Sequence, residues 1–200
     1  MPSRALTITP GYAIAMSSFN FTKTMLPLLG VLQLHEEITM THSFTILTDS
    51  SCNLPDEIIN ANELEILPLS LMCDGIEVVT YDRSRKSDLS MFYRILRQGK
   101  VFTTSLPNMQ DTIDTIHRIL KSGSDLLYVG FSSGLSGTYE ATVNILNNIS
   151  PEYPDRKIYA CDTRGASLGE GMLVMYAIDM RREGKPIEEV HEWLQEHRFH

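Results

Sequence analysis

Four clusters of hydroxyl, carboxyl and glycine residues could do chemistry in this 200-residue chain. They are Thr48–Ser51, Thr103–Pro107, Ser132–Thr138 and Asp162–Ser167. Backbone N–H groups at helix N-termini bind anions, and Ser and Thr hydroxyls add further donors. The clusters therefore predict a site for a negatively charged group. The alternative is that each cluster only caps the helix after it, because Ser, Thr, Asp and Asn are the common N-cap residues.

The third cluster also permits nucleophilic chemistry. Residues 130–134 match G-x-S-x-G between a strand-like and a helix-like run, which is the pattern of a nucleophile elbow with Ser132 as the nucleophile. Asp162 and His191 follow in the Ser, Asp, His order of the α/β-hydrolases. However, His191 falls inside a predicted helix, and no HGGG-like loop precedes Ser132. A serine acyl hydrolase that uses Ser132 is therefore the alternative function.

The sequence predicts no metal site. His197 and His200 lie three residues apart with no third ligand nearby. Asp49 and Asp162 each end a predicted strand, but without further carboxylates we expect them to accept hydrogen bonds from neighbouring hydroxyls. The three cysteines form no C-x-x-C pair, which indicates reduced thiols in a cytoplasmic protein.

Strands and helices must alternate from Ser43 onward to position these clusters. Strands are expected over residues 44–48, 64–72, 76–81, 125–131 and 157–161. Helices are expected over residues 55–62, 88–98, 109–122, 136–147, 167–182 and 187–197, with a loop over 99–107. Ser87 and Asn108 supply N-caps for two of the helices. Strands separated by crossover helices predict an α/β fold with a doubly wound parallel sheet, whose ligands bind at the carboxyl ends of the strands.

Net charge and hydropathy exclude some functions for this chain, and its sequence pattern suggests domain boundaries. Its 17 Lys and Arg against 25 Asp and Glu give a net charge of −8, which argues against nucleic-acid binding. The apolar run 24–34 is too short to span a bilayer. We expect residues 1–39 to be a poorly ordered arm or an extension upstream of a natural start at Met40. Residues 40–164 are expected to form the α/β domain. Residues 165–200 are expected to begin a truncated second domain, because no strand follows the last helix.

Five motifs give the chain its resemblance to the DegV family of bacterial fatty-acid-binding proteins, of the FakB type. They are TDSSCNLP (48–55), ILPLSLMCDG (66–75), TSLPN (104–108), SSGLSGTY (132–139) and DTRGASLGEG (162–171). They occur in the family's order, and the likeness covers about residues 43–197. The resemblance implies a Rossmann-like N-terminal domain of the DegV fold, followed by the first helices of an incomplete second α/β domain.

The resemblance also implies which residues bind a ligand. In the family, the Thr of T-S-x-P and the Ser of L-S-G-T hold the carboxylate of one long-chain fatty acid, and these residues correspond to Thr104 and Ser136. Leu106 stands where the family usually has Gln. Secondary candidates are Ser105, Ser132, Ser133 and Gly137 from the same motifs, and Asp49 and Ser50 from the first cluster.

The role implied by the resemblance is that of a carrier rather than an enzyme. Such a protein offers a bound acid, such as palmitate, stearate or oleate, to a separate ATP-dependent fatty-acid kinase. The kinase makes the acyl phosphate used in phospholipid synthesis. The carrier is expected to be cytoplasmic and to need no cofactor or metal of its own. A third interpretation is a purely structural remnant with no ligand.

Overall fold

The computed structural model describes residues 44–84 and 89–199. The predicted extension 1–39, the start at Met40 and the helix cap at Ser87 lie outside the described residues. No helix within those two ranges is long and apolar enough to cross a membrane.

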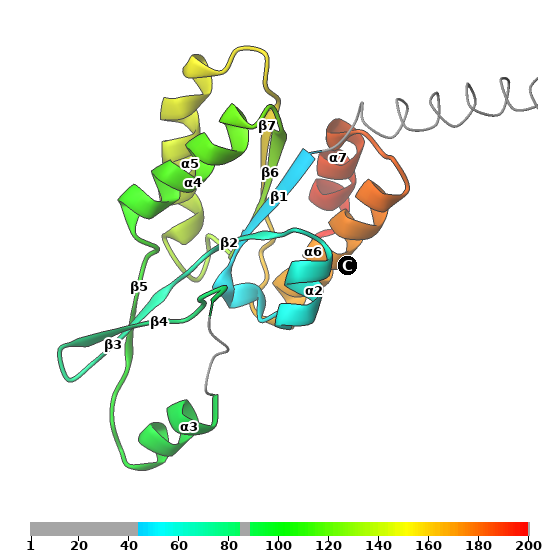
Figure 1. Cartoon of the computed structure of the whole chain (residues 1–200). Coiled ribbons are helices and arrows are strands. Elements are labelled where there is room, and N and C mark those ends of the chain that lie inside the picture. Colours follow the sequence, from blue (N-terminus) through cyan, green and yellow to red (C-terminus); the bar gives the residue numbers. More distant parts are fainter. Residues whose placement is uncertain (1–43, 85–88, 200) are drawn as a thin grey trace, which may run out of the picture. The chain divides into compact units, whose positions relative to one another are not determined.

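A four-stranded parallel sheet forms the centre of the domain (Figure 1). Its strands are β1 (Phe44–Asp49), β2 (Glu65–Leu67), β6 (Asp125–Gly130) and β7 (Ile158–Asp162), in the order β2-β1-β6-β7. Neighbouring strands run parallel throughout. The predicted doubly wound α/β sheet is therefore confirmed.

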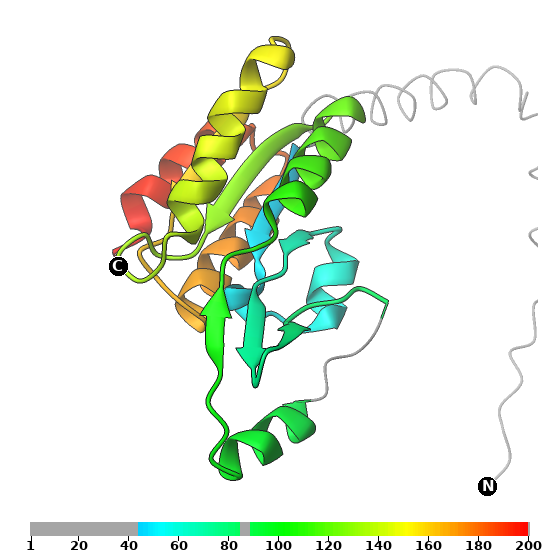
Figure 2. The same cartoon turned by 90° about the vertical axis from the view of Figure 1, so that its left-hand side faces the viewer.

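Helices cover both faces of this sheet (Figures 1 and 2). One face carries α2 (Asp56–Ala61), α6 (Leu168–Arg182) and α7 (Ile187–His197). The other carries α4 (Met109–Lys121) and α5 (Thr138–Ile149). Successive residues of β6 alternate between the two cores, as a strand requires: Leu127 and Val129 pack with α6 and α7, whereas Leu126 and Tyr128 pack with α4 and α5. The apolar run 125–131 is thus a strand buried on both faces, as predicted.

A second, three-stranded sheet is antiparallel, in the order β4-β3-β5. It contains β3 (Ser70–Cys73), β4 (Ile76–Val79) and β5 (Thr103–Ser105), and α3 (Leu89–Arg97) lies between β4 and β5 in the chain. The hairpin of β3 and β4 confirms the predicted turn at residues 73–75. The short helices η2 (Ser50–Cys52) and η3 (Ser150–Glu152) complete the structure.

Two predictions about this second sheet were wrong. Residues 64–72 do not form one strand, because β2 pairs in the first sheet and β3 pairs in the second. The break falls at Pro68, which has no N–H for a strand ladder, and at Leu69, whose N–H donates to the Ser50 hydroxyl at 3.0 Å. The predicted loop over 99–107 contains β5, a strand of three residues that pairs with β3.

The two C-terminal helices pack on the same sheet as the residues before them. Val174 and Ile178 of α6 and Val190 and Leu194 of α7 are buried in one core with Val129 of β6. The sequence assigned residues 165–200 to the start of a second domain, but α6 and α7 within this range cover one face of the first sheet. No strand follows α7 among residues 198 and 199, and the helix packs against the preceding strand, β7.

Helix α6 approaches η2 closely at Gly171, and a substitution at this position tests that contact. A Cβ at position 171 would lie 2.7 Å from the backbone oxygen of Cys52, whereas a Cβ at Gly169, two residues earlier, would meet nothing within 4 Å. We expect Gly171→Ala to lower the free energy of unfolding by roughly 1–3 kcal/mol through overpacking. The matched variant Gly169→Ala should be neutral, or more stable by up to about 1 kcal/mol from helix propensity. Urea unfolding of both variants measures the difference, and equal stabilities would contradict this contact.

Candidate functional site

Three of the four polar clusters meet at the carboxyl edge of the parallel sheet. Asp49 ends β1, Ser132 follows β6, and Asp162 ends β7 beside Gly130. The fourth cluster, with Thr104, lies on β5 of the antiparallel sheet. Three of the four clusters that predicted a site for a negatively charged group therefore lie at the same sheet edge.

The two residues predicted to hold a carboxylate are in different settings. Thr104 is the central residue of β5 opposite Leu71, and its side chain is exposed. Within the described residues its hydroxyl makes no hydrogen bond. Ser136 is half-buried in the loop before α5, where its Oγ accepts the N–H of Thr138 at 3.2 Å and lies 2.9 Å from Thr138 Oγ1. No hydrogen bond joins Thr104 to Ser136 in the described structure, and their role in binding stays a prediction.

Ser105 and Gly137 are both exposed. Ser105 pairs with Ser70 across the antiparallel sheet. Gly137 is the N-cap residue of α5 and supplies no side-chain hydrogen bond to the helix. Ser136 Oγ accepts the N–H of Thr138, and the other N–H groups of the first turn of α5 have no N-cap side chain to accept them, which is the arrangement that favours an anion.

Ser50 joins the two sheets. Its hydroxyl accepts the N–H of Leu69 at 3.0 Å and lies 2.6 Å from Thr80 Oγ1, which in turn donates to the carbonyl of Leu69. Ser50 is thus occupied in holding the chain where it passes from β2 into β3.

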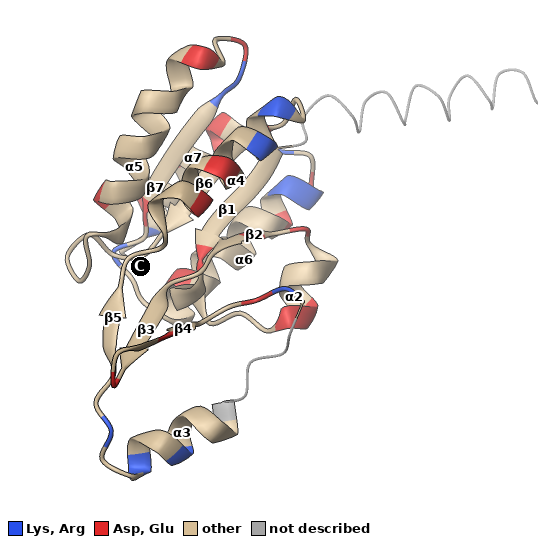
Figure 3. Cartoon of the chain, turned by 60° about the vertical axis from the view of Figure 1, so that its left-hand side comes forward, with Lys and Arg blue, Asp and Glu red and all other residues tan. Residues whose placement is uncertain are grey.

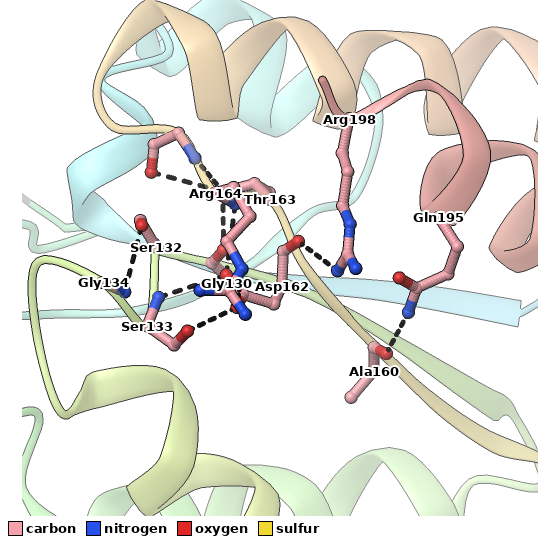
Figure 4. Close-up of polar contacts among 11 residues, drawn as sticks. Gly130, Ser132, Ser133, Gly134, Ala160, Asp162, Thr163, Arg164, Gln195 and Arg198 are labelled. Carbon is pink, nitrogen blue, oxygen red and sulfur yellow. Dashed lines mark hydrogen bonds and ion pairs between the residues drawn. The ribbon is translucent and has the colours of Figure 1, made fainter.

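Asp162 is the centre of a second polar network, drawn in Figure 4. One carboxylate oxygen accepts the backbone N–H groups of Ser133 and Arg164, both at 3.1 Å. The other accepts the Ser133 hydroxyl at 2.5 Å and contacts Arg164 Nε at 2.8 Å. Burial acts to raise the pKa of Asp162, but these hydrogen bonds and the Arg164 charge outweigh it and lower the pKa. Asp162 is therefore a charged carboxylate that holds the loop after β6 against the loop after β7.

The described residues do not assemble a hydrolase triad around Ser132. The Ser132 hydroxyl is buried and accepts the N–H of Gly134 at 3.2 Å. His191 lies on α7, where its Nε2 is 3.1 Å from the carbonyl oxygen of Ala160. Asp162 interacts with Ser133 and Arg164 rather than with His191. The Ser, Asp, His order in the sequence therefore has no counterpart in the geometry.

A buried pair of carboxyl groups lies under the same edge, and the sequence analysis singled out only one of them. Asp49 ends β1, and Glu170 lies in the first turn of α6; both are fully buried. Asp49 accepts the N–H of Phe131 at 3.0 Å and the Tyr128 hydroxyl at 3.3 Å. Glu170 accepts the Thr48 hydroxyl at 3.1 Å. One signal in the sequence could have placed Glu170, because it lies three, four and seven residues before the apolar positions 173, 174 and 177.

The geometry around Ser51 requires a proton on this pair. Ser51 Oγ lies 2.5 Å from Asp49 Oδ1 and 2.5 Å from Glu170 Oε2. A serine hydroxyl has one proton, so it can donate to only one carboxylate. The second short contact needs a proton on a carboxyl group. We therefore expect Glu170 to be protonated and to donate to Ser51, which donates to Asp49.

The electrostatics agree with that assignment. Burial, followed by the charge of Asp49, raises the pKa of Glu170 from 4.5 to about 9. Burial also raises the pKa of Asp49, although hydrogen bonds from Ser51, Phe131 and Tyr128 act in the opposite direction. Burial likewise raises the pKa of the nearby Cys52 thiol to about 12, so this thiol is neutral.

An apolar groove of about 580 Å³ lies between α4 and α5. It begins at Leu106, two residues after Thr104, and extends along both helices. Its lining residues are Leu106, Pro107, Met109, Thr112, Ile113, His117, Ala141, Thr142, Asn144, Ile145, Asn148, Ile149 and Glu152. No group of three potential metal-ligating side chains occurs in the described part of the chain.

The parallel sheet and its polar carboxyl edge define a doubly wound α/β protein. The model of the family described as "Uncharacterised protein, DegV family" matches residues 43–200. The chain belongs to the DegV family, which confirms the resemblance seen in its motifs.

Individual relatives agree with this assignment. The DegV domain-containing protein CPE0026 of Clostridium perfringens is 37% identical over 157 residues, which are 78% of this chain and 53% of that protein. A DegV family protein from Thermus thermophilus is 28% identical with a TM-score of 0.65, over 78% of this chain and 53% of that one. Protein TM841 from Thermotoga maritima is 28% identical with a TM-score of 0.67, over 78% and 55%. The chain thus spans about half the length of the relatives it matches.

The protonated carboxyl pair predicts how stability depends on pH. Between the unfolded pKa of 4.5 and the folded pKa of about 9, the folded protein holds a proton on Glu170 that the unfolded chain releases. The free energy of unfolding should therefore fall as pH rises through this window, by up to about 1.4 kcal/mol per pH unit from this group. Glu170→Gln should remove that slope and be more stable than the wild type at pH 7.5. Urea unfolding between pH 5.5 and 8.5 measures both effects.

Glu140→Gln is the matched control, because Glu140 is an exposed carboxylate in the first turn of α5. It should keep the pH dependence of the wild type. If Glu170→Gln also kept it, Glu170 would be ionised in the folded protein and the assignment of the proton would be wrong.

Proposed function

We propose that the protein binds a long-chain fatty acid and holds its carboxylate with the hydroxyls of Thr104 and Ser136. Family membership supports this proposal. So do the solved relatives from Thermus thermophilus and Thermotoga maritima, whose structures are described in terms of fatty acid binding. The observation in this chain that carries the proposal is the first turn of α5, directly after Ser136, whose N-cap residue Gly137 supplies no side-chain hydrogen bond.

The available donors suit a carboxylate. Thr104 is exposed, and its hydroxyl has no hydrogen bond within the described residues. Ser136 can donate its proton to a ligand when the Thr138 hydroxyl donates to Ser136 Oγ, and the two oxygens are 2.9 Å apart. Hydrogen bonds to a charged group contribute about 1.5–3 kcal/mol each. Two hydroxyls and the first turn of α5 would thus orient the head group without a buried cation.

The hydrocarbon tail supplies most of the affinity. Removing each CH₂ group from water contributes about 0.8 kcal/mol, so a long-chain acid has a gross driving force on the order of 10 kcal/mol. The apolar groove that begins at Leu106 offers this chain one surface for the tail. The hydroxyl donors then decide which end of the ligand faces the sheet edge.

The proposed role is that of a carrier. It presents the bound acid to a separate ATP-dependent fatty-acid kinase, which forms the acyl phosphate for phospholipid synthesis in the cytoplasm. The kinase would bind the nucleotide and its metal ion, so this chain would need no cofactor. The hydroxyl-rich edge supports a binding role, because its carboxylates Asp49 and Asp162 are occupied by internal hydrogen bonds.

The carboxylate assignment predicts different losses for an acid and its ester. Thr104→Val and Ser136→Ala should each weaken oleate binding about tenfold or more, because each removes a hydrogen bond to a charged oxygen. Methyl oleate has no charged oxygen, so its affinity should change much less. Isothermal titration calorimetry with both ligands on delipidated protein measures the two effects.

Thr103→Val is the matched control, because Thr103 precedes Thr104 on β5 and faces the opposite side of the strand. It should bind both ligands like the wild type. Equal losses for oleate and its ester in the Thr104 and Ser136 variants would refute the carboxylate assignment. Native mass spectrometry of the purified chain, with identification of any released molecule, tests whether this length of chain retains an acid at all.

A further inference from the structure

The segment 83–107, which contains α3 and β5, is basic in an otherwise acidic chain. Residues 83–107 contain six Lys and Arg and one Asp, a net charge of +5. The other 175 residues contain 11 basic and 24 acidic residues, a net charge of −13. The charged residues on the described part of α3 are arginines, and Figure 3 shows no acidic residue there. Of the six basic residues, Arg94 and Arg97 lie on α3, and Lys100 follows it.

The same element exposes apolar side chains. No side chain described on α3 is buried. Tyr93 is 53% exposed and Leu96 38%, and Val101 shortly after the helix is 75% exposed. Phe92 packs on the ring of Phe102 with 5.0 Å between ring centroids, which connects α3 to the segment leading into β5. We call residues 90–101 the α3 surface.

The two arginines border the apolar side of this helix. At 100° per residue, Phe92, Tyr93 and Leu96 share one side of α3, Arg94 lies opposite Leu96, and Arg97 lies beside Tyr93. Lys100 is paired with Asp74 at 2.6 Å, but no described acidic residue pairs with Arg94 or Arg97. An apolar side with Tyr and Phe, flanked by arginines without acidic partners, is typical of a helix that lies in a lipid interface.

We propose that the α3 surface docks on an anionic lipid bilayer. The charge of the segment complements lipid phosphates, and long Arg side chains can keep their charge at the head groups while their stems cover apolar surface. Aromatic side chains such as Tyr93 favour the boundary between hydrocarbon and water. This inference rests on the charge and exposure of α3, and it stands independently of fatty-acid binding.

Vesicle flotation tests the proposal. The 200-residue chain should bind fatty-acid-free vesicles of phosphatidylglycerol and phosphatidylcholine, and bind pure phosphatidylcholine vesicles much more weakly. Each Lys or Arg near an anionic surface contributes about fivefold in affinity, so Arg94→Gln with Arg97→Gln should weaken binding about 25-fold. Tyr93→Ser with Leu96→Ser should also weaken it, and higher salt should reduce binding by the wild type.

Two control variants remove positive charge or an exposed apolar side chain from α4 and α6 instead of α3. Lys121→Gln with Arg182→Gln deletes two exposed positive charges at the ends of α4 and α6, and Leu168→Ser deletes an exposed apolar side chain on α6. Both should bind vesicles like the wild type, and circular dichroism checks that every variant is folded. In a Tyr93→Trp variant, the added tryptophan emission should shift to shorter wavelength with anionic vesicles, after subtraction of the wild-type Trp193 signal.

Three results would overturn the proposal. The first is no binding of the wild type to anionic vesicles, as expected if α3 docks on an acidic protein instead. The second is equal binding by the arginine variant. The third is an equal loss in the α4 and α6 controls, which would make the attraction non-specific. Because the vesicles contain no fatty acid, none of these results bears on the roles of Thr104 and Ser136.

Discussion

The Asp49 carboxyl group joins the elements on which the edge of the parallel sheet depends. It ends β1, accepts hydrogen bonds from Tyr128 and Phe131 on and after β6, and reaches Glu170 of α6 through the Ser51 hydroxyl. A buried carboxylate is costly unless donors surround it, and a second charge beside it costs more. Donors from β1, η2 and β6 surround Asp49 and Glu170, and a proton on one of the two carboxyl groups removes the second charge. Polar residues after these strands therefore stabilise the fold through internal hydrogen bonds, whether or not a ligand is bound.

The predicted site residues fall into two groups, according to whether the loops that carry them use their side chains in internal hydrogen bonds. Ser50 bonds to Leu69, Ser133 bonds to Asp162, and Ser132 accepts from Gly134, so their hydroxyls are committed to the loops that carry them. Thr104, Ser105 and Gly137 are exposed, and Ser136 is half-buried at the start of α5. The residues that the family motifs assign to the carboxylate belong to the less committed group. A ligand at those residues would use donors that the fold does not need.

The sequence predicted the elements that have strong local signals. The buried run of β6, the Asn108 cap of α4 and the two C-terminal helices were all recognisable, because periodicity and capping are local properties. β2, β3 and β5 have three or four residues each, and they form by pairing with other strands. The strand at Thr104 and the pairing of β2 and β3 in different sheets were therefore not predictable from the local sequence, although Pro68 marks the break between β2 and β3. Glu170 was missed for a related reason. A glutamate in the first turn of a helix is usually an exposed charge that favours the helix dipole, and its burial depends on contacts about 120 residues away in the sequence.

The two sheets differ in how completely they are buried, and this difference bears on binding. The parallel sheet has helices on both faces, whereas β4 and β5 are exposed along their whole length. Thr104 belongs to the exposed sheet, and Ser136 follows a strand of the buried one. Segments with few buried apolar contacts open at lower free energy than the core of the same domain. A carboxylate held by both residues would link the exposed sheet to the buried one, as Ser50 already does at Leu69 and Thr80. Binding would then stabilise the exposed sheet most, because the buried sheet is already held by its own core.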